Sequence, residues 1–133
     1  MLQNAAARYE QVKVTTTSKG ELLLALYRGL FRFLNGARAC FEQGKSAQGR
    51  ELISKAHAVI TELQIALDPD QSPGLCGNLY GVYDFSLVTL REASLRADAS
   101  KVEEVLQVLT PLKEAWEKAV PEAARQGICH RAE

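Results

Sequence analysis

Apolar residues recur every three or four positions along most of the chain, which is the spacing of a helix with one buried face. Four such series follow one another, over residues 23–41, 52–67, 75–97 and 102–120. Gly44 closes the first series, and a short polar turn separates it from the second. No alternation of apolar and polar residues typical of a β-strand competes with these series. The pattern therefore predicts four helices.

Capping residues mark the starts of two of these helices. Ser18 and Glu21 precede the first series, and Ser100 and Glu103 open the fourth, each pair at the spacing of a capping box. In such a box the serine oxygen accepts a backbone N–H, and the glutamate reaches back to the cap residue. We expect a helix to begin at both places.

Prolines mark a third helix start and an irregularity in the last helix. Residues 68–74 form a break rich in Pro and Asp, in which Ser72 can cap and Pro73 can take the first helical position. Pro111 lies inside the fourth series, where a proline loses one hydrogen bond and crowds the preceding turn. We predict a kink there rather than a stop, because the apolar spacing continues in phase to Trp116.

The four helices and their short turns define a fold class. Helices joined in this way pack antiparallel with their apolar faces inward. We predict an all-α protein, an antiparallel up-down-up-down four-helix bundle with a short N-terminal cap segment. We expect residues 1–17 to form that cap segment, residues 18–120 the bundle and residues 121–133 a flexible C-terminal tail.

Composition and charge narrow the function classes. The 133 residues suit one domain, and a hydrophobic share of 47% excludes a disordered chain. Sixteen Lys and Arg residues balance sixteen Asp and Glu residues, so the basic excess that phosphate contacts require is missing. No apolar run approaches the ~20 residues needed to cross a bilayer. We expect no nucleic-acid binding and no membrane insertion.

The N-terminus and the cysteines bear on the cellular compartment. The first residues lack a basic start followed by an apolar stretch, so they do not resemble a secretory signal. The three cysteines, Cys40, Cys76 and Cys129, form no C-x-x-C pair. We interpret them as fitting neither a disulfide framework nor a zinc site. The sequence therefore predicts a cytoplasmic protein.

Catalytic chemistry has few candidates. His57 and His130 are the two histidines, and neither has the Glu three residues earlier that di-iron bundles place there. No phosphate-binding glycine loop or nucleophile elbow occurs. We expect no enzyme activity, no catalytic residue, no metal and no cofactor. An alternative is a histidine phosphotransfer module that uses His57, although residues 58–61 lack the lysine and glycine that steady the phosphate in such modules.

The first helix carries more apolar surface than one core face needs. Beside its core series runs a second one, formed by Leu24, Tyr27, Phe31 and Leu34. Each such side chain gains about 1.5–3 kcal/mol on burial, and soluble monomers rarely expose a patch of this size. Three interpretations stay open: both series are core, the second is a groove for an amphipathic partner helix, or it makes a homodimer of a self-associating structural bundle.

Two other places carry apolar residues outside the core series. On the third helix, Phe85 and Val88 point away from the core beside Gly81 and form a weaker second patch. The segment before the first helix carries Tyr9 and Val12. We expect this segment to lie over the groove in the free protein and to be displaced by the partner.

Several short segments, in their order and separations, resemble a known family. They are Tyr9, Val-Thr-Thr-Thr-Ser at 14–18, Leu-Tyr-Arg-Gly-Leu at 26–30, Lys-Ala with Ile-Thr-Glu-Leu and Leu-Asp within 55–68, Asn-Leu-Tyr-Gly-Val-Tyr-Asp-Phe at 78–85 and Glu-Ala-Trp at 114–116. Together they resemble the bacterial flagellar secretion chaperone family FliS, which binds flagellin. The resemblance covers most of the chain, with Arg28 in place of the acidic residue usual in that family.

The resemblance implies a cytoplasmic, non-enzymatic export chaperone. Such proteins bind the C-terminal helical segment of flagellin, prevent its premature polymerisation and keep it competent for flagellar secretion. The flagellar export apparatus is a further implied partner. By this analogy we expect the partner-binding residues to be Leu24, Tyr27, Phe31 and Leu34, with Phe85 and Val88 as the second patch and Tyr9 and Val12 as the displaceable cover.

Overall fold

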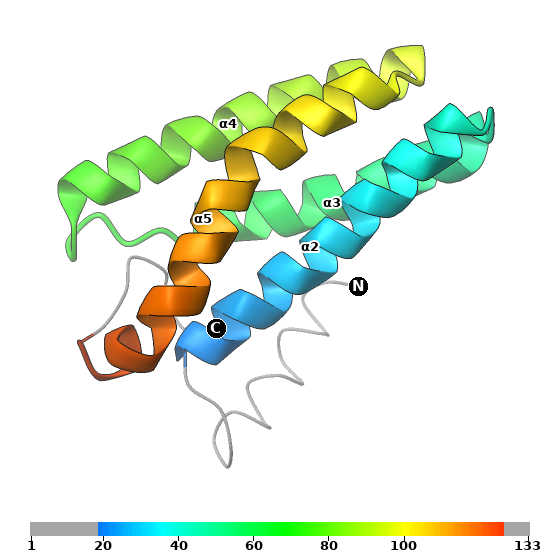
Figure 1. The fold of residues 1–133 in the computed structure, drawn as a ribbon. Helices are drawn as coiled ribbons and strands as arrows, with labels where there is room; N and C mark the ends of the chain where they lie inside the picture. The colour runs from blue at the N-terminus through cyan, green and yellow to red at the C-terminus, as the bar shows by residue number, and fades with distance from the viewer. Residues whose placement is uncertain (1–18, 127–133) are drawn as a thin grey trace.

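Four helices make up the part of the chain that the computed structural model describes, residues 19–126, with side chains described for residues 19–120. The helices are α2 (Lys19–Glu42), α3 (Ser46–Ile65), α4 (Pro73–Arg96) and α5 (Ala99–Gln126). α2 and α4 each pack against both α3 and α5, and consecutive helices run in opposite directions (Figure 1). The predicted all-α up-down-up-down bundle is confirmed.

Short connections set the ends of α2, α3 and α4. Gly44 adopts a positive φ of 77° between α2 and α3, a conformation that glycine reaches without steric cost. Pro73 is the first residue of α4, as predicted, and the Ser72 carbonyl accepts the N–H of Cys76 at 2.8 Å. The Ser72 side chain makes no capping hydrogen bond, so this part of the prediction is wrong. The expected cap at Ser18 lies outside the described residues.

Asp98, rather than Ser100, caps α5. The helix begins at Ala99, one position before the predicted cap. The Asp98 carboxylate accepts the Ser100 hydroxyl at 2.6 Å and the Ser100 backbone N–H at 2.9 Å. These two bonds hold the pKa of Asp98 below its ordinary value. The prediction at Ser100 is wrong because the aspartate just before the helix accepts the N–H that a cap must satisfy.

α5 passes through Pro111 without a break and bends along its length. In Figure 1 its yellow N-terminal half runs beside α4, and its orange C-terminal half turns away toward the start of α2. Pro111 has no N–H to donate, and the Thr110 hydroxyl donates to the Leu106 carbonyl at 2.7 Å, a bond that often bends helices. The predicted kink is confirmed. The helix ends at Gln126, beyond the end of the bundle that the sequence suggested.

The core draws on all four helices. The largest fully buried side chains are Tyr27, Leu30 and Leu34 of α2, Ile60 and Leu63 of α3, Leu79, Tyr83 and Leu90 of α4, and Val102, Val105 and Leu109 of α5. At the other end of α5, Val120 packs against the start of α2, where a Cβ added to Gly20 would lie 2.6 Å from Val120 Cγ1. α5 thus packs against both α2 and α4, and its first half already contacts α2 through the ion pair of Glu103 with Arg38.

The cysteines correct one interpretation drawn from the sequence. Cys76, in the first turn of α4, is buried and disulfide-bonded, and Cys40 of α2 is a free cysteine. The view that the cysteines fit no disulfide is therefore wrong at Cys76. Pairing depends on how closely the fold brings two Cα atoms together, which spacing along the sequence does not reveal.

Residues 19–126 contain neither a membrane span nor a cluster of metal-ligating side chains. Within residues 19–126 no helix combines the length and the apolar character that a membrane span requires. Within that part there is also no group of three or more His, Cys, Asp or Glu side chains arranged to hold a metal ion.

Candidate functional site: an apolar groove between two helices

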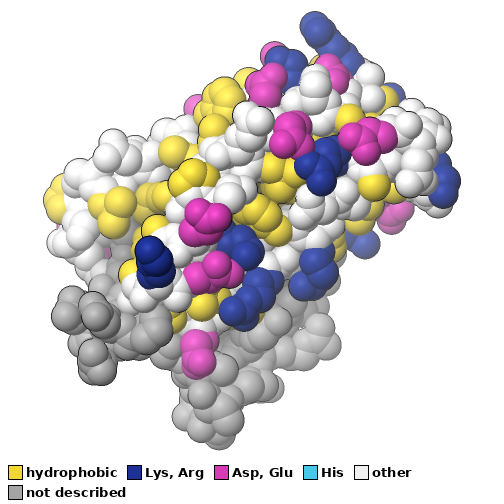
Figure 2. Space-filling model, viewed as in Figure 1, with side chains coloured by type: hydrophobic (Ala, Val, Ile, Leu, Met, Phe, Trp, Pro, Cys, Tyr) yellow, Lys and Arg dark blue, Asp and Glu magenta, His cyan; other side chains and the backbone are white. Residues whose placement is uncertain are grey.

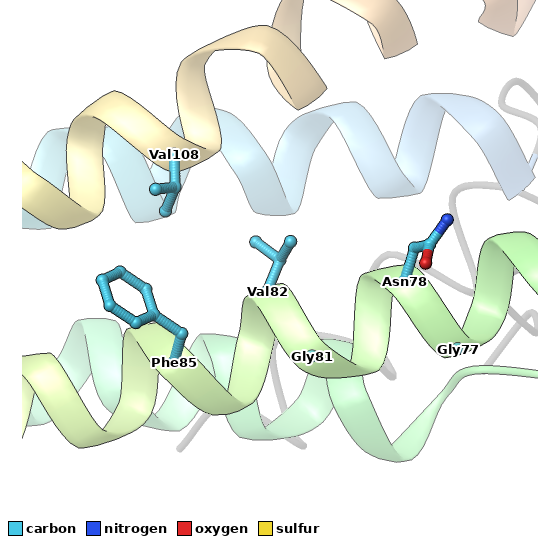
Figure 3. A pocket seen from close by; sticks show the side chains of 6 residues that line it. All are labelled: Gly77, Asn78, Gly81, Val82, Phe85 and Val108. Atoms are coloured by element: carbon cyan, nitrogen blue, oxygen red, sulfur yellow. The ribbon is translucent and has the colours of Figure 1, made fainter.

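A shallow groove of about 430 Å³ lies between the N-terminal half of α4 and α5. It is lined by Gly77, Asn78, Gly81, Val82, Phe85 and Val108. Figure 3 shows the side chains of Val82 and Phe85 rising from α4 toward Val108, which points down from α5. Apart from the Asn78 amide, the side chains that line the groove are apolar. We call it the α4–α5 groove.

Two glycines on successive turns of α4 open the floor of this groove. A Cβ added at Gly77 or at Gly81 would meet no heavy atom within 4 Å, so neither glycine is required by contacts with a neighbouring helix of the bundle. Glycine inside a helix costs about 1 kcal/mol relative to alanine. At this position the missing side chains leave bare backbone that a second helix can approach closely.

The surface of α4 carries several exposed apolar side chains. Most of the exposed large hydrophobic side chains within residues 19–120 belong to α4, namely Leu75, Tyr80, Phe85, Val88 and Leu95. Phe85 is 45% exposed and Val88 is 43% exposed. Figure 2 shows hydrophobic side chains gathered over α4 and along its seam with α5, with charged ones over α5 and α2. Of these residues, Phe85 lines the groove and Val88 lies about one turn further along α4, and neighbouring exposed apolar residues of this kind are typical of an interaction surface.

The second apolar series of α2 lies mostly in the core. Leu24, Tyr27 and Leu34 are only 8%, 0% and 0% exposed. Phe31 is half-buried, and the Lys113 ammonium of α5 lies 5.5 Å from the centroid of its ring. Because α2 lies between α3 and α5, it needs a wide apolar face. Of the three interpretations of this series, the structure supports a core role for Leu24, Tyr27 and Leu34. The prediction of a groove on α2 is therefore wrong.

Of the remaining expected site residues, two lie on the surface and two lie outside the described part of the chain. Phe85 and Val88 are exposed, as the sequence predicts, and Phe85 lines the groove. Tyr9 and Val12 lie outside the described residues. Sequence reasoning missed Asn78 and Val108, because a groove formed by two helices cannot be seen in the pattern of either. The pairing of Gly81 with Phe85 was the one available signal.

A hydrogen-bonded tyrosine pair lies inside the bundle. The hydroxyl groups of Tyr27 on α2 and Tyr83 on α4 are 2.6 Å apart, and both side chains are 0% exposed. Burial raises the pKa of both tyrosines, and hydrogen bonding with Tyr83 and with Trp116 offsets part of that rise for Tyr27. The two hydroxyls stay protonated at neutral pH and join diagonally opposite helices. Their role is structural.

His57 lies on α3 and faces α4. Its Nε2 atom is 3.3 Å from Nη1 of Arg91. Burial, followed by the charge of Arg91, lowers the pKa of His57, so the imidazole is neutral at pH 7. Use of His57 as a phosphoacceptor stays an untested alternative.

Comparisons with known proteins identify the family. The family model for the flagellar protein FliS matches residues 1–123 of the chain. The chain belongs to the FliS family. The flagellar secretion chaperone FliS of Salmonella typhimurium is 34% identical over 123 residues, which cover 89% of this chain and 91% of that protein. FliS of Bacillus subtilis is 29% identical over 119 residues, 90% of this chain and 88% of that protein.

A solved structure shares the fold of this FliS-family chain. It is described as the crystal structure of a flagellar chaperone from bacteria, and it matches with a TM-score of 0.73 at 21% sequence identity. The match covers 92% of this chain and 99% of the other. Tyr27 and Tyr83 each lie in one of the segments that carry the resemblance, and their hydroxyls form a buried hydrogen-bonded pair.

Proposed function

We propose that this chain is a cytoplasmic export chaperone that binds the C-terminal helical segment of flagellin in the α4–α5 groove. In this function it keeps flagellin from polymerising too early and competent for flagellar secretion. The relatives support the chaperone role, because they are flagellar secretion chaperones of the same family. The observation that carries the placement is the exposure of Phe85 and Val88 beside a groove with a glycine floor.

The chemistry of the groove suits an amphipathic helix. Apolar side chains of the client pack on Phe85, Val82 and Val108, and the bare backbone at Gly77 and Gly81 lets the client helix approach. A segment that is disordered before binding loses conformational entropy when it folds onto the chaperone. Burial of each large apolar side chain contributes about 1.5–3 kcal/mol against that cost.

The other expected binding residues take different places in this proposal. Leu24, Tyr27 and Leu34 belong to the buried core, and Phe31 stays a candidate contact at the edge of α2. Tyr9 and Val12 remain the proposed cover, displaced by the client. The proposed activity is binding without catalysis, and delivery to the export apparatus follows from the family role. The cytoplasmic location also comes from the family, since the disulfide at Cys76 by itself favours an oxidising compartment.

Calorimetric titration of the full chain with a peptide of the flagellin C-terminal segment tests the proposal. Because apolar surface is buried on binding, the titration should show a negative heat-capacity change. Phe85→Asp places a charge at the groove, and we expect it to weaken binding about 10- to 100-fold, from the loss of about 1.5–3 kcal/mol. Ile65→Asp is the matched control, because Ile65 is 67% exposed on α3 and does not line the groove.

The outcomes separate the alternatives. No heat and no complex on a sizing column at tens of micromolar would remove flagellin as the client. Equal weakening by Phe85→Asp and Ile65→Asp would remove the α4–α5 groove as the site. If Phe85→Asp instead dissociates a homodimer seen by sedimentation and the peptide does not bind, the apolar patch is a self-association surface.

A further inference from the structure

A second pocket lies on a different side of α4, against α3. It has a volume of about 200 Å³ and is lined by Arg50, Ile53, Ser54 and His57 of α3 and by Leu90, Arg91 and Ser94 of α4. Arg50, Ser54 and His57 follow one another at helical spacing, so their side chains share one face of α3. This pocket shares no lining residue with the α4–α5 groove.

Positive charge in this pocket is not balanced by a carboxylate. No Asp or Glu lines it. Among the side chains of residues 19–120, the ion pairs that the structure shows involve Arg38, Lys101 and Lys113, and neither Arg50 nor Arg91 takes part in one. Two arginines therefore line one small pocket that no carboxylate lines. Arginine side chains arranged in this way are typical of sites for carboxylate and phosphate groups.

Hydrogen bonds within the pocket hold both arginines in place. Arg50 Nε donates to the Ser94 carbonyl at 2.7 Å, and Arg91 Nη1 lies 3.3 Å from His57 Nε2. A guanidinium has five N–H donors and stays protonated, so each arginine keeps further donors for a ligand. Arg91 can only donate, and His57 Nε2 therefore accepts and carries no proton. The hydroxyls of Ser54 and Ser94 add two adaptable donors to the same pocket.

We propose that this pocket binds one oxyanion group, bracketed by the guanidinium groups of Arg50 and Arg91 and contacted by the hydroxyls of Ser54 and Ser94. The volume of about 200 Å³ has room for a single phosphate or carboxylate group. The oxyanion comes either from free phosphate or from an acidic side chain. Because the two sites share no residue, failure of the flagellin proposal leaves this one intact, and the reverse also holds.

His57 provides a local reporter of binding. The charged groups that line the pocket with it are Arg50 from its own helix and Arg91 from α4. In the free protein, burial and Arg91 lower the pKa of His57. An anion beside the imidazole favours its charged form, and nearby opposite charges raise histidine pKa values by about one unit or more. Occupation of the pocket should therefore raise the pKa of His57.

The experiment follows the His57 ring signals by NMR in the full-length protein, with His57→Gln used to assign them. Inorganic phosphate is titrated at constant ionic strength against chloride, and acetate forms a second arm. We expect a saturable upward shift of the His57 pKa by about one unit. Response to phosphate alone assigns the site to phosphate, and an equal response to acetate assigns it to carboxylates.

Charge-removing variants show whether the shift belongs to this pocket. Arg50→Gln and Arg91→Gln should each reduce the anion response at least tenfold, while Arg28→Gln, an exposed arginine of α2, should leave it unchanged. Arg91→Gln should also raise the pKa of His57 in chloride, because it removes the neighbouring charge. Absence of a saturable shift in both arms, or a shift that persists in both pocket variants, would overturn the proposal. Circular dichroism checks that each variant keeps its helicity.

Discussion

Tyr27 and Tyr83 show why a motif residue need not be a binding residue. Both belong to the segments by which the chain resembles its family, and both are fully buried in the bundle. Each hydroxyl needs a partner inside the core, because an unsatisfied buried polar group costs about 1–3 kcal/mol. The 2.6 Å contact between them supplies that partner. A pair of this kind also favours one register of α2 against α4, since a shifted register separates the hydroxyls.

The tyrosine pair predicts a coupled loss of stability. Tyr27→Phe and Tyr83→Phe should each lower the free energy of unfolding by about 1–3 kcal/mol, because each removes one partner of a buried bond. The double variant should cost less than the sum of the two, since it leaves no hydroxyl behind at this contact. Urea denaturation of the four proteins measures the coupling. Strict additivity would contradict the account of the pair.

Asp98 predicts a pH dependence at the start of α5. Its pKa is lowered by the two bonds from Ser100, so the folded protein gains stability from the charged form. That gain is complete above the unfolded carboxyl pKa of about 3.9 and is lost as the pH falls through the lower folded value. Asp98→Ala should therefore lower the melting temperature at pH 7, and the difference from the wild type should shrink below pH 4. A difference that is constant from pH 7 to pH 3 would count against Asp98 as a charged cap.

The sequence pattern predicted the role of a residue only where that role depends on the residue's own helix and not on neighbouring helices. Pro73 and the kink at Pro111 follow from the chemistry of proline itself, and both are confirmed. The burial of Leu24 and Leu34 could not be predicted, because periodicity shows that a face is apolar and not how many neighbours cover it. Asp98 was missed because Asp98 and Ser100, two positions apart, could both act as a cap, and only the start of the helix distinguishes them.

At the scale of elements, α4 and α5 together make the candidate site. α4 is apolar on its inner face, with Leu79, Tyr83 and Leu90, and also on its outer face, with Phe85 and Val88. Val108 of α5 lines the groove with α4, and the C-terminal half of α5 bends away from α4 (Figure 1). The bend accompanies an open groove on the side of α4 that faces α5, while α3 packs against another side of α4. The sequence predicted both the kink and the exposed pair, but not that the two meet at one groove.

The glycine floor of the groove predicts a variant that gains stability and loses binding. Gly81→Ala adds a Cβ into open space and should raise the free energy of unfolding by about 1 kcal/mol through helix propensity. The same methyl group occupies the groove and should weaken binding of the flagellin peptide. Thermal unfolding and calorimetric titration measure the two effects.

Gly29→Ala is the matched control for this variant. Gly29 lies inside α2, where an added Cβ would make only an ordinary contact with Arg32 at 3.7 Å. The control should gain similar stability and leave peptide binding unchanged. If Gly81→Ala binds the peptide as tightly as the wild type does, the client helix does not approach the backbone at that position.

At the scale of the whole molecule, the bundle was the most predictable feature. Four apolar series with clear breaks leave few ways to bury every face, and an antiparallel bundle is the simplest. The surface was less predictable, because exposure depends on how far each pair of helices diverges. The family supplies the chaperone role, and we propose that a client binds on α4 and α5 rather than on α2.

Mapping the client on the whole molecule tests this account most directly. Amide chemical-shift changes are recorded on the isotopically labelled full-length protein as the flagellin C-terminal peptide is added. The account predicts that the largest changes fall on residues 77–88 of α4 and around Val108 of α5. Binding that leaves these residues unchanged and shifts only the outer surfaces of α2 and α3 would contradict it.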